Sequence, residues 1–287
     1  MIDRFDALAA LQSSGTMGSA ASALRITQSA ISKRIASLER EVGVKLVERH
    51  GRRVRLTPHA EQLLEHARPL LAGLREVLHA RRAQRHAALR VAATDSLLAS
   101  WLPVTLRAAL DRLPGLSLEL HAHRGPTLVE RVRSGDYSIG FCPSIAGDKD
   151  LLVREVAREP MVIVPARLEP WPVAQAGTEV AVWAIETRSL TWEAVAARLS
   201  RLPRKLGFGL RVEGRLESFT ALVQIARAGF GHALVPIGVA RDLGVPSERL
   251  VHLGDLSRPI AVVGRRKAFE LAGVKQLLQQ LGPLWPR

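Results

Sequence analysis

Residues 15–39 constrain the fold of this chain most, because they predict two short helices joined by a turn with almost no spare residues. Thr16 is placed to cap the first helix, in which Ala20 and Ala21 offer small faces that let a second helix approach closely. Thr27 is placed to cap that second helix. Two helices packed so tightly are typical of a helix-turn-helix that reads DNA.

The predicted second helix has two unlike faces. At about 100° per residue, one apolar stripe contains Ile31, Ile35, Leu38 and Val42. The opposite face is polar and free of acidic side chains, with Ser29, Ser32, Lys33 and Ala36. Gln28 carries an amide that suits adenine in a major groove, and the hydroxyls suit phosphates or base edges. An amphipathic helix by itself favours an ordinary solvated surface, so the DNA-binding interpretation depends on the residues after this helix.

Those residues form a basic turn. Positive side chains crowd a turn centred on Gly51, namely Lys45, Arg49, Arg52, Arg53 and Arg55. Val54 and Leu56 follow with the alternation of a strand, so the segment predicts a β-hairpin wing whose cations lie along a phosphate backbone. The residues predicted to bind DNA are Thr27, Gln28, Ser29, Ser32, Lys33, Arg34, Arg49, Arg52 and Arg53.

Residues 15–58 resemble the winged helix-turn-helix of LysR-type transcriptional regulators in residue type and in spacing. The resemblance rests on segments 15–21, 27–32, 38–39, 43–44 and 56–58, with Leu24, Ile35, Leu46 and Arg49. The chain departs from the family at Val47, where a phenylalanine usually packs behind the wing, and at His59 and Ala60, which replace an alanine and a glycine. The length and order of the remaining chain also match, so the resemblance covers the whole chain.

The resemblance implies an α/β protein with three parts: a winged helix-turn-helix at residues 1–58, a linker and dimerisation helix at 59–88, and an effector-binding domain at 89–287. That last domain is implied to be periplasmic-binding-protein-like, with lobe I at 89–160 and 260–287 and lobe II at 161–259. The implied partners are double-stranded promoter DNA, a small-molecule effector, RNA polymerase and further copies of the chain, in a homodimer or homotetramer.

Composition agrees with a DNA-binding protein. The formal net charge is +14, and the first 88 residues hold 15 Lys and Arg against 8 Asp and Glu, where a polyanion would dock. A single cysteine, Cys142, excludes an internal disulfide; it is interpreted as a small buried hydrophobe, with a redox sensor as the alternative. With no secretory signal and no apolar run near the ~20 residues of a membrane span, the chain is predicted to be cytoplasmic.

A long helix is predicted after the wing, with Thr57 as its N-cap and Pro58 in its first turn. Its apolar residues recur at spacings of four and three, in a stripe too wide for a lone solvated helix. The predicted dimerisation residues are Leu63, Leu70, Leu74 and Val77. The stripe has two interpretations: burial against the chain's own body, or, as the resemblance implies, an antiparallel helix pair that spaces two DNA-binding heads.

From Leu89 onward, short predicted strands alternate with helices, which favours an open and mostly parallel α/β architecture. The strands are predicted at 89–93, 116–122, 139–142, 161–164, 180–184, 210–212, 233–235, 250–253 and 260–263. The helices are predicted at 96–113, 127–134, 192–199, 219–228, 237–243 and 269–281. In such a sheet, ligands bind beyond the carboxyl ends of the strands, near helix N-termini.

Three predicted strand-to-helix turns bring polar residues to that edge of the sheet. The predicted ligand-binding residues are Thr94, Asp95, Ser96, Arg124, Thr127, Ser218, Phe219 and Thr220. Ordinary helix capping explains each hydroxyl equally well, so the prediction rests on their convergence in one cleft. Arg124 is placed to hold a carboxylate and Asp95 an ammonium group, which favours an amino acid or another small polar metabolite such as an organic acid.

Residues 26–30, 93–97 and 101–103 also resemble the arginine/lysine-responsive branch of the family, although residues 123–125 stand where that branch tends to be acidic. The sequence shows no Ser/His/Asp arrangement at family spacing, no phosphate-binding glycine loop and no His-x-x-x-His pair. We therefore expect no enzyme activity, no catalytic residue, no metal and no cofactor. The predicted function is a DNA-binding regulator that responds to a small metabolite; the alternative is a ligand-independent, architectural DNA-binding protein.

Overall fold

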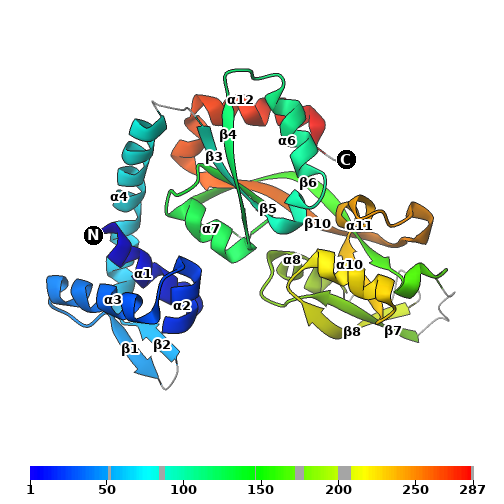
Figure 1. The fold of residues 1–287 in the computed structure, drawn as a ribbon, viewed down its shortest axis with the longest axis horizontal. Helices are drawn as coiled ribbons and strands as arrows, with labels where there is room; N and C mark the ends of the chain where they lie inside the picture. The colour runs from blue at the N-terminus through cyan, green and yellow to red at the C-terminus, as the bar shows by residue number, and fades with distance from the viewer. Residues whose placement is uncertain (51–52, 84–87, 146, 172–177, 200–207, 286–287) are drawn as a thin grey trace. The chain divides into compact units, whose positions relative to one another are not determined.

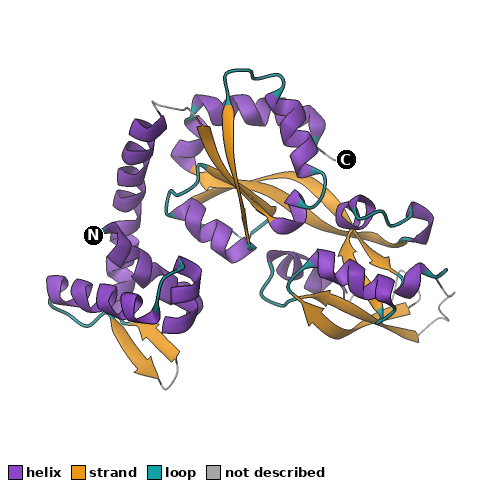
Figure 2. Ribbon diagram, in the orientation of Figure 1, coloured by secondary structure: helices purple, strands orange, loops and turns teal. Residues whose placement is uncertain are grey.

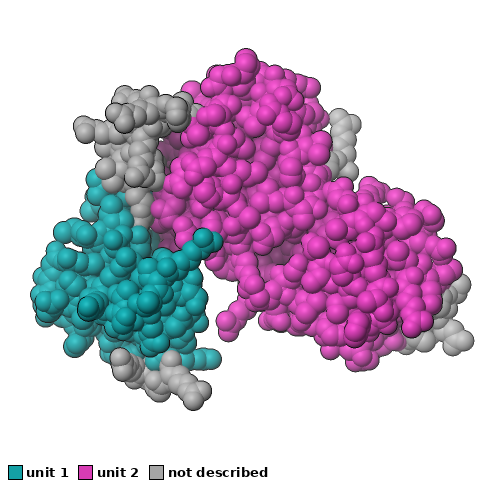
Figure 3. Space-filling view, viewed as in Figure 1, with its two compact units in different colours: residues 1–82 teal, residues 83–287 magenta. Residues whose placement is uncertain are grey.

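The computed structural model describes the chain except for residues 51–52, 84–87, 146, 172–177, 200–207 and 286–287. The chain divides into two compact units, residues 1–82 and residues 83–287, shown in teal and magenta in Figure 3. Each unit has its own buried apolar core. No described helix is long and apolar enough to cross a membrane.

The first unit contains helices and one antiparallel hairpin (Figures 1 and 2). Its elements are α1 (Ile2–Ser14), α2 (Met17–Leu24), α3 (Gln28–Val42), β1 (Val47–His50), β2 (Arg53–Leu56) and α4 (Pro58–Ala83). The predicted caps are confirmed, because Thr16 Oγ1 accepts the N–H of Ser19 at 3.1 Å and Thr27 Oγ1 accepts that of Ala30 at 3.2 Å. The helix-turn-helix and the wing are therefore present.

The apolar face of α3 closes the core of this unit. Ile31, Ile35 and Leu38 are buried there beside the small residues of α2. Val42, the fourth member of the predicted stripe, is 36% exposed. Val42 is the last residue of α3, and the chain turns away at Gly43, whose φ of 75° suits glycine.

Helix α4 begins as predicted. The Thr57 hydroxyl accepts the N–H of Ala60 at 3.2 Å and donates to the carbonyl of Lys45 at 2.9 Å. The helix stops short of the predicted residue 88, and Ala88 is instead the first residue of strand β3 (Ala88–Thr94).

The second unit is built on one sheet, whose described strands follow the order β4-β3-β5-β10-β6-β9-β7-β8. The strands besides β3 are β4 (Ser117–His123), β5 (Ile139–Pro143), β6 (Leu151–Val164), β7 (Thr178–Ile185), β8 (Phe208–Leu216), β9 (His232–Pro236) and β10 (Val251–Arg265). β4, β3 and β5 are parallel in the first lobe, and β9, β7 and β8 are parallel in the second. β6 and β10 pair antiparallel to each other and connect the lobes (Figure 1). The predicted two-lobed α/β fold is confirmed.

The two connecting strands are longer than the sequence predicts. The predicted strand 260–263 and the predicted strand 250–253, apart from its first residue, belong to one strand, β10. The predicted strand 161–164 is only the end of β6. A buried charged residue interrupts the apolar pattern of each, Glu159 in β6 and Arg258 in β10. Hydrophobic periodicity therefore could not show that these strands continue.

Helices lie against the sheet in both lobes (Figure 1). They are α5 (Asp95–Leu98), α6 (Leu102–Leu110), α7 (Gly125–Arg133), α8 (Leu190–Leu199), α10 (Phe219–Ala228), α11 (Ile237–Asp242) and α12 (Ala272–Leu281). The single helix predicted at 96–113 is two helices, because the Ser100 hydroxyl donates to a backbone carbonyl of α5 and Pro103 favours a new helix start. The helix predicted at 269–281 begins at Ala272.

Cys142 lies in the apolar interior of the first lobe. Its exposed fraction is 0%, and burial raises the pKa of its thiol to about 12. The residue is the small buried hydrophobe that the sequence predicts.

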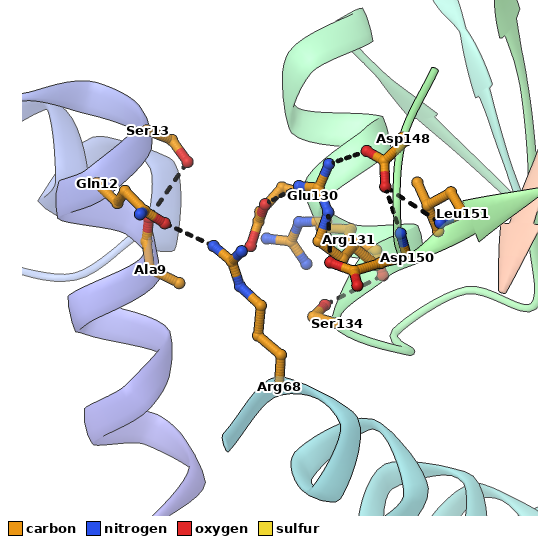
Figure 4. Close-up of polar contacts among 11 residues, drawn as sticks. Ala9, Gln12, Ser13, Arg68, Glu130, Arg131, Ser134, Asp148, Asp150 and Leu151 are labelled. Carbon is orange, nitrogen blue, oxygen red and sulfur yellow. Dashed lines mark hydrogen bonds and ion pairs between the residues drawn. The ribbon is translucent and has the colours of Figure 1, made fainter. Parts of the chain in front are cut away.

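Charged side chains tie α7 to the loop after β5. Arg133 donates to the carboxylates of Glu130 and Asp148, each at 2.5 Å. Asp148 in turn accepts the backbone N–H of Asp150 at 2.9 Å and of Leu151 at 3.1 Å (Figure 4). Because the side chains of Arg133 and Asp148 are 19% and 14% exposed, the network is shielded from water and helps to fix α7 in the first lobe.

Candidate nucleic-acid interface and ligand pocket

The first turns of α3 present a polar surface. Thr27, Gln28, Ser29 and Lys33 are exposed, and Ser32 is half-buried. Thr27 Oγ1 caps the helix and also lies 2.9 Å from Ser29 Oγ, so these two hydroxyls are already engaged. Gln28 and Lys33 supply the longest exposed side chains of this surface. A helix that enters a major groove needs such side chains to reach the edges of the bases.

Arg34 differs from the other residues predicted on this surface. Its side chain is 30% exposed, and its Nη2 lies 3.7 Å from a carboxylate oxygen of Asp3 in α1. The contact joins α3 to α1. The Asp3 carboxylate offsets part of the positive charge of Arg34, which the sequence predicts to bind DNA.

The wing is the antiparallel hairpin of β1 and β2. Arg53 and Arg55 of β2 are exposed, and their spacing of two residues places them on the same face of the strand. Among the other predicted wing cations, Arg52 and the side chain of Arg49 lie outside the described part of the chain. Glu48 of β1 lies opposite Arg55 on this face, so two arginines against one glutamate leave the described part of the face net positive, which suits a phosphate backbone.

Two leucines of the predicted dimerisation stripe are exposed on α4. Leu70 is 74% exposed and Leu74 is 46% exposed, and their spacing of four residues places them on one face of the helix. Leu63 is half-buried against the core of the first unit, so part of its surface is used within the chain. The side chain of Val77 lies outside the described residues.

A pocket of about 350 Å³ is formed by both lobes of the second unit. It is lined by all eight residues of the ligand-binding prediction, Thr94, Asp95, Ser96, Arg124, Thr127, Ser218, Phe219 and Thr220. They come from the β3–α5 turn, the start of α7 and the β8–α10 turn, so the fold brings together segments that are far apart in sequence. Within the described ranges, no three His, Cys, Asp or Glu side chains are grouped as metal ligands.

The sequence reasoning missed a fourth segment of this pocket, the turn between β7 and α8. Its lining residues are Ile185, Glu186, Arg188, Ser189, Leu190 and Thr191. It is a strand-to-helix turn like the others, so the same topological rule applies to it. Leu190 also packs against Gly125 of the first lobe, where a Cβ atom would lie 2.6 Å from the leucine side chain, so glycine permits the lobes to approach closely.

The pocket hydroxyls are not all helix caps. Ser218 does cap α10, because its hydroxyl oxygen accepts the N–H of Ala221 at 3.3 Å. Thr94 precedes α5 without capping it; the residue is 7% exposed, and its hydroxyl has no hydrogen-bond partner among the described residues. Since an unpaired buried hydroxyl costs free energy, a polar ligand atom would be stabilised beside Thr94.

Arg124 already faces a carboxylate of its own chain. Its Nη1 donates to Glu217 Oε1 at 2.6 Å and its Nη2 donates to Glu217 Oε2, so this ion pair is bidentate and joins the two lobes. The hydrogen bond from Arg124 lowers the pKa of Glu217. Arg124 therefore pairs with Glu217 in this structure, and its binding of a ligand carboxylate stays a prediction.

A buried ion pair supports two pocket residues from behind. Arg258 and Glu159 are 0% and 3% exposed, and Arg258 donates from Nε and Nη2 to Glu159 Oε2 at 2.9 and 2.7 Å. Its Nη1 donates to Ser96 Oγ at 2.9 Å and to Thr191 Oγ1 at 3.0 Å. One guanidinium group thus orients a hydroxyl from each lobe.

The sequence contains a sign of this pair that hydrophobic periodicity does not use. Residues 158–160 (Arg-Glu-Pro) and 257–259 (Ser-Arg-Pro) stand directly before the apolar runs 161–164 and 260–263. Glu159 and Arg258 each stand two residues before a run that is apolar enough to be buried, and a charge buried beside such a run requires a buried partner.

Comparison with known protein families divides the chain near the boundary between its two compact units. Residues 2–61 match the bacterial regulatory helix-turn-helix protein model of the lysR family, and residues 82–285 match the LysR substrate binding domain. The chain belongs to the LysR family of transcriptional regulators. This regulator therefore combines a DNA-binding domain with an effector-binding domain.

Relatives and solved structures agree with this assignment. The LysR-family chain is 27% identical over 292 residues to an HTH-type transcriptional regulator of Vibrio cholerae, across 100% of this chain and 97% of that protein. It is 36% identical over 132 residues to a probable hydrogen peroxide-inducible genes activator of Mycobacterium xenopi, across 45% of this chain and 70% of that protein. The crystal structure of CbnR, a LysR family transcriptional regulator, has the same fold, with a TM-score of 0.55 at 21% identity over 98% of this chain and 99% of CbnR.

Proposed function

We propose that this LysR-family regulator binds a small carboxylate-bearing metabolite, an amino acid or an organic acid, in the pocket between its lobes. One observation supports this most: eight residues predicted from three separate turns line one pocket of about 350 Å³. That volume lies at the small end of the range for ligand sites, which suits a metabolite of a few heavy atoms. Bound metabolite then shifts the population between conformations that space the DNA-binding heads differently.

Charged groups of both signs line the pocket. Arg124 and Arg188 are the cations, and Asp95, Glu186 and Glu217 are the carboxylates. In this proposal Arg124 holds the carboxylate of the ligand and Asp95 accepts its ammonium group. The resemblance to the arginine/lysine-responsive branch agrees with an amino acid, whereas the position of Arg124 disfavours a strongly cationic one.

The proposal extends to the assembly and its partners. Residues 1–58 bind double-stranded promoter DNA, residues 59–88 pair with a second copy in a homodimer or homotetramer, and residues 89–287 bind the effector. The regulator acts in the cytoplasm and contacts RNA polymerase. CbnR has been solved as a full-length protein in complex with its target DNA, which supports the first of these assignments.

Thiol-based sensing is not supported, although the name of one relative refers to hydrogen peroxide. Cys142 is 0% exposed and its thiol has a pKa of about 12, so it is neither accessible nor ionised near pH 7. It is also the single cysteine of the chain, so no second thiol is available for an internal disulfide.

A screen of amino acids and organic acids against thermal unfolding of the full-length protein tests the metabolite proposal. An effector at a hundredfold excess over its Kd is expected to raise the free energy of unfolding by about 2.7 kcal/mol. Arg124→Ala is expected to abolish the shift, whereas Arg112→Ala, which changes an exposed arginine outside the pocket, is expected to keep it. A complete panel without any shift would instead indicate the ligand-independent architectural protein.

The variant Gln28→Ala tests whether α3 recognises a specific DNA sequence. If the Gln28 amide bonds bidentately to a base, its loss is expected to cost about 1 to 3 kcal/mol on the specific site and much less on random DNA. Equal losses on both DNAs, measured by fluorescence anisotropy, would show that Gln28 does not read sequence.

The wing is expected to respond differently. Arg53→Ala is expected to weaken binding to specific and random DNA alike and to reduce the slope of log K against log salt by about one phosphate contact. The matched control is Arg112→Ala in the effector-binding domain, which is expected to leave the salt slope unchanged. An unaltered slope for Arg53→Ala would remove the wing from the interface.

A further inference from the structure

Arg124 and Glu217 face each other across the pocket. Arg124 is the N-cap residue of α7 in the first lobe, and Glu217 stands between β8 and α10 in the second, 93 residues further along the chain. Their bidentate contact is the geometry that an arginine makes with a free carboxylate ligand. Glu217 therefore occupies the position that a ligand's carboxylate would take at Arg124.

The two ion pairs of the pocket region differ in their exposure to water. Arg258 and Glu159 are 0% and 3% exposed, so separating them would leave a charge buried without a partner. Arg124 and Glu217 are 61% and 57% exposed, so water solvates each side chain when the pair separates. A competing carboxylate can therefore replace Glu217 at Arg124 at little cost in free energy.

The other charges of the pocket indicate which ligand gains most from that replacement. With Glu217 paired to Arg124, the remaining charged residues that line the pocket are Asp95, Glu186 and Arg188. A simple carboxylate that takes Arg124 leaves three protein carboxylates beside one remaining arginine. A zwitterion makes the same exchange and offers its ammonium group to the carboxylate that it releases.

We propose that Glu217 is a specificity-determining residue of the pocket: it is an internal carboxylate that the ligand displaces from Arg124, and it then binds the ligand's ammonium group together with Asp95. The inference rests on the proposed metabolite-binding function and narrows the ligand class to zwitterions such as free amino acids. The zwitterion replaces a direct arginine–glutamate contact with a bridge between the same two lobes. Binding therefore changes one of the contacts that join the lobes.

Two small probes test this exchange without the natural effector. Propionate and L-alanine share a carbon skeleton and differ by one ammonium group, and NMR titrations of the full-length protein measure the affinity of each. Because Glu217 competes for Arg124 and an exposed ion pair contributes little net free energy, Glu217→Ala is expected to tighten propionate binding by about two- to fivefold. L-alanine keeps Asp95 but loses Glu217 as an ammonium partner in this variant and is expected to gain less, so the preference of the unmodified protein for L-alanine falls.

Three further variants control the test. Glu217→Gln keeps the size of the side chain, in case alanine disturbs the adjacent start of α10, and is expected to show the same gain for propionate. Glu217→Ala combined with Arg124→Gln is expected to lose that gain. Asp111→Ala removes a carboxylate from the exposed Arg107–Asp111 pair outside the pocket and is expected to change neither titration.

Unchanged propionate binding in both Glu217 variants overturns the proposal, as does a gain that survives Arg124→Gln or appears equally in Asp111→Ala. The metabolite screen tests the sensing function independently of the exchange at Arg124. If no metabolite shifts the unmodified protein while propionate binds Glu217→Ala through Arg124, the exchange stands and the sensing function falls. A metabolite response without any propionate gain overturns the exchange and leaves the sensing function standing.

Discussion

Replacing Arg258 with methionine is expected to destabilise residues 83–287 by about 3 to 5 kcal/mol. The change leaves the Glu159 carboxylate, which is 3% exposed, without the guanidinium group that donates two hydrogen bonds to it. All five tryptophans lie in this unit, so thermal unfolding followed by tryptophan fluorescence reports on it alone. A fall in Tm of about 6 °C or more is expected.

Two controls separate burial of a charge from loss of an ion pair. Arg258→Met combined with Glu159→Gln removes the unpaired charge and keeps an acceptor for the N–H of Gly238, so much of the lost stability is expected to return. Arg107→Met breaks the exposed pair with Asp111, which is expected to cost no more than about 1 kcal/mol. Equal melting temperatures for Arg258→Met and Arg107→Met would contradict the assignment of Arg258 as a stabilising residue.

Replacing both Leu70 and Leu74 with aspartate is expected to dissociate the proposed dimer. The two side chains are 74% and 46% exposed on one face of α4, and the substitutions would place carboxylates in the apolar seam between two such helices. Each buried carboxylate without a partner costs several kcal/mol unless it is protonated or the seam opens. Light scattering is then expected to report the mass of one chain, 31.3 kDa.

The matched control changes charge on the other side of α4. Glu61 and Glu65 are exposed and precede Leu70 by nine and five residues, which places them on the opposite face of the helix. Glu61→Gln with Glu65→Gln is expected to leave the oligomeric mass unchanged. An intact dimer in the double aspartate variant would place the interface on another surface.

Features that depend on neighbouring residues could be predicted from the sequence. The caps at Thr16, Thr27 and Thr57 need only residues within one helical turn, and all three are present. The stripe of α3 follows from helical spacing, although the sequence could not show that its last member, Val42, extends beyond the core. The strand-to-helix turns that line the pocket follow from the alternation of strands and helices.

Interactions between distant residues could not be predicted in this way. The sequence placed Arg124 at the pocket but assigned its charge to a ligand, whereas its guanidinium group meets Glu217, 93 residues away. Arg34 was assigned to DNA, yet it lies beside Asp3 of α1. No local pattern states which distant carboxylate an arginine will meet.

The sequence by itself determined the winged helix-turn-helix, the α/β character of the second unit and three of the segments around the pocket, because these follow from caps, spacing and the alternation of elements. The two lobes were implied by the resemblance to the LysR family. Only the tertiary structure decided which charges are paired and which are buried. Sheet order places β6 beside β10, so Glu159 and Arg258, 99 residues apart, meet where water is excluded. The free energy of a charge depends on its surroundings in space, and these exist only once the chain has folded.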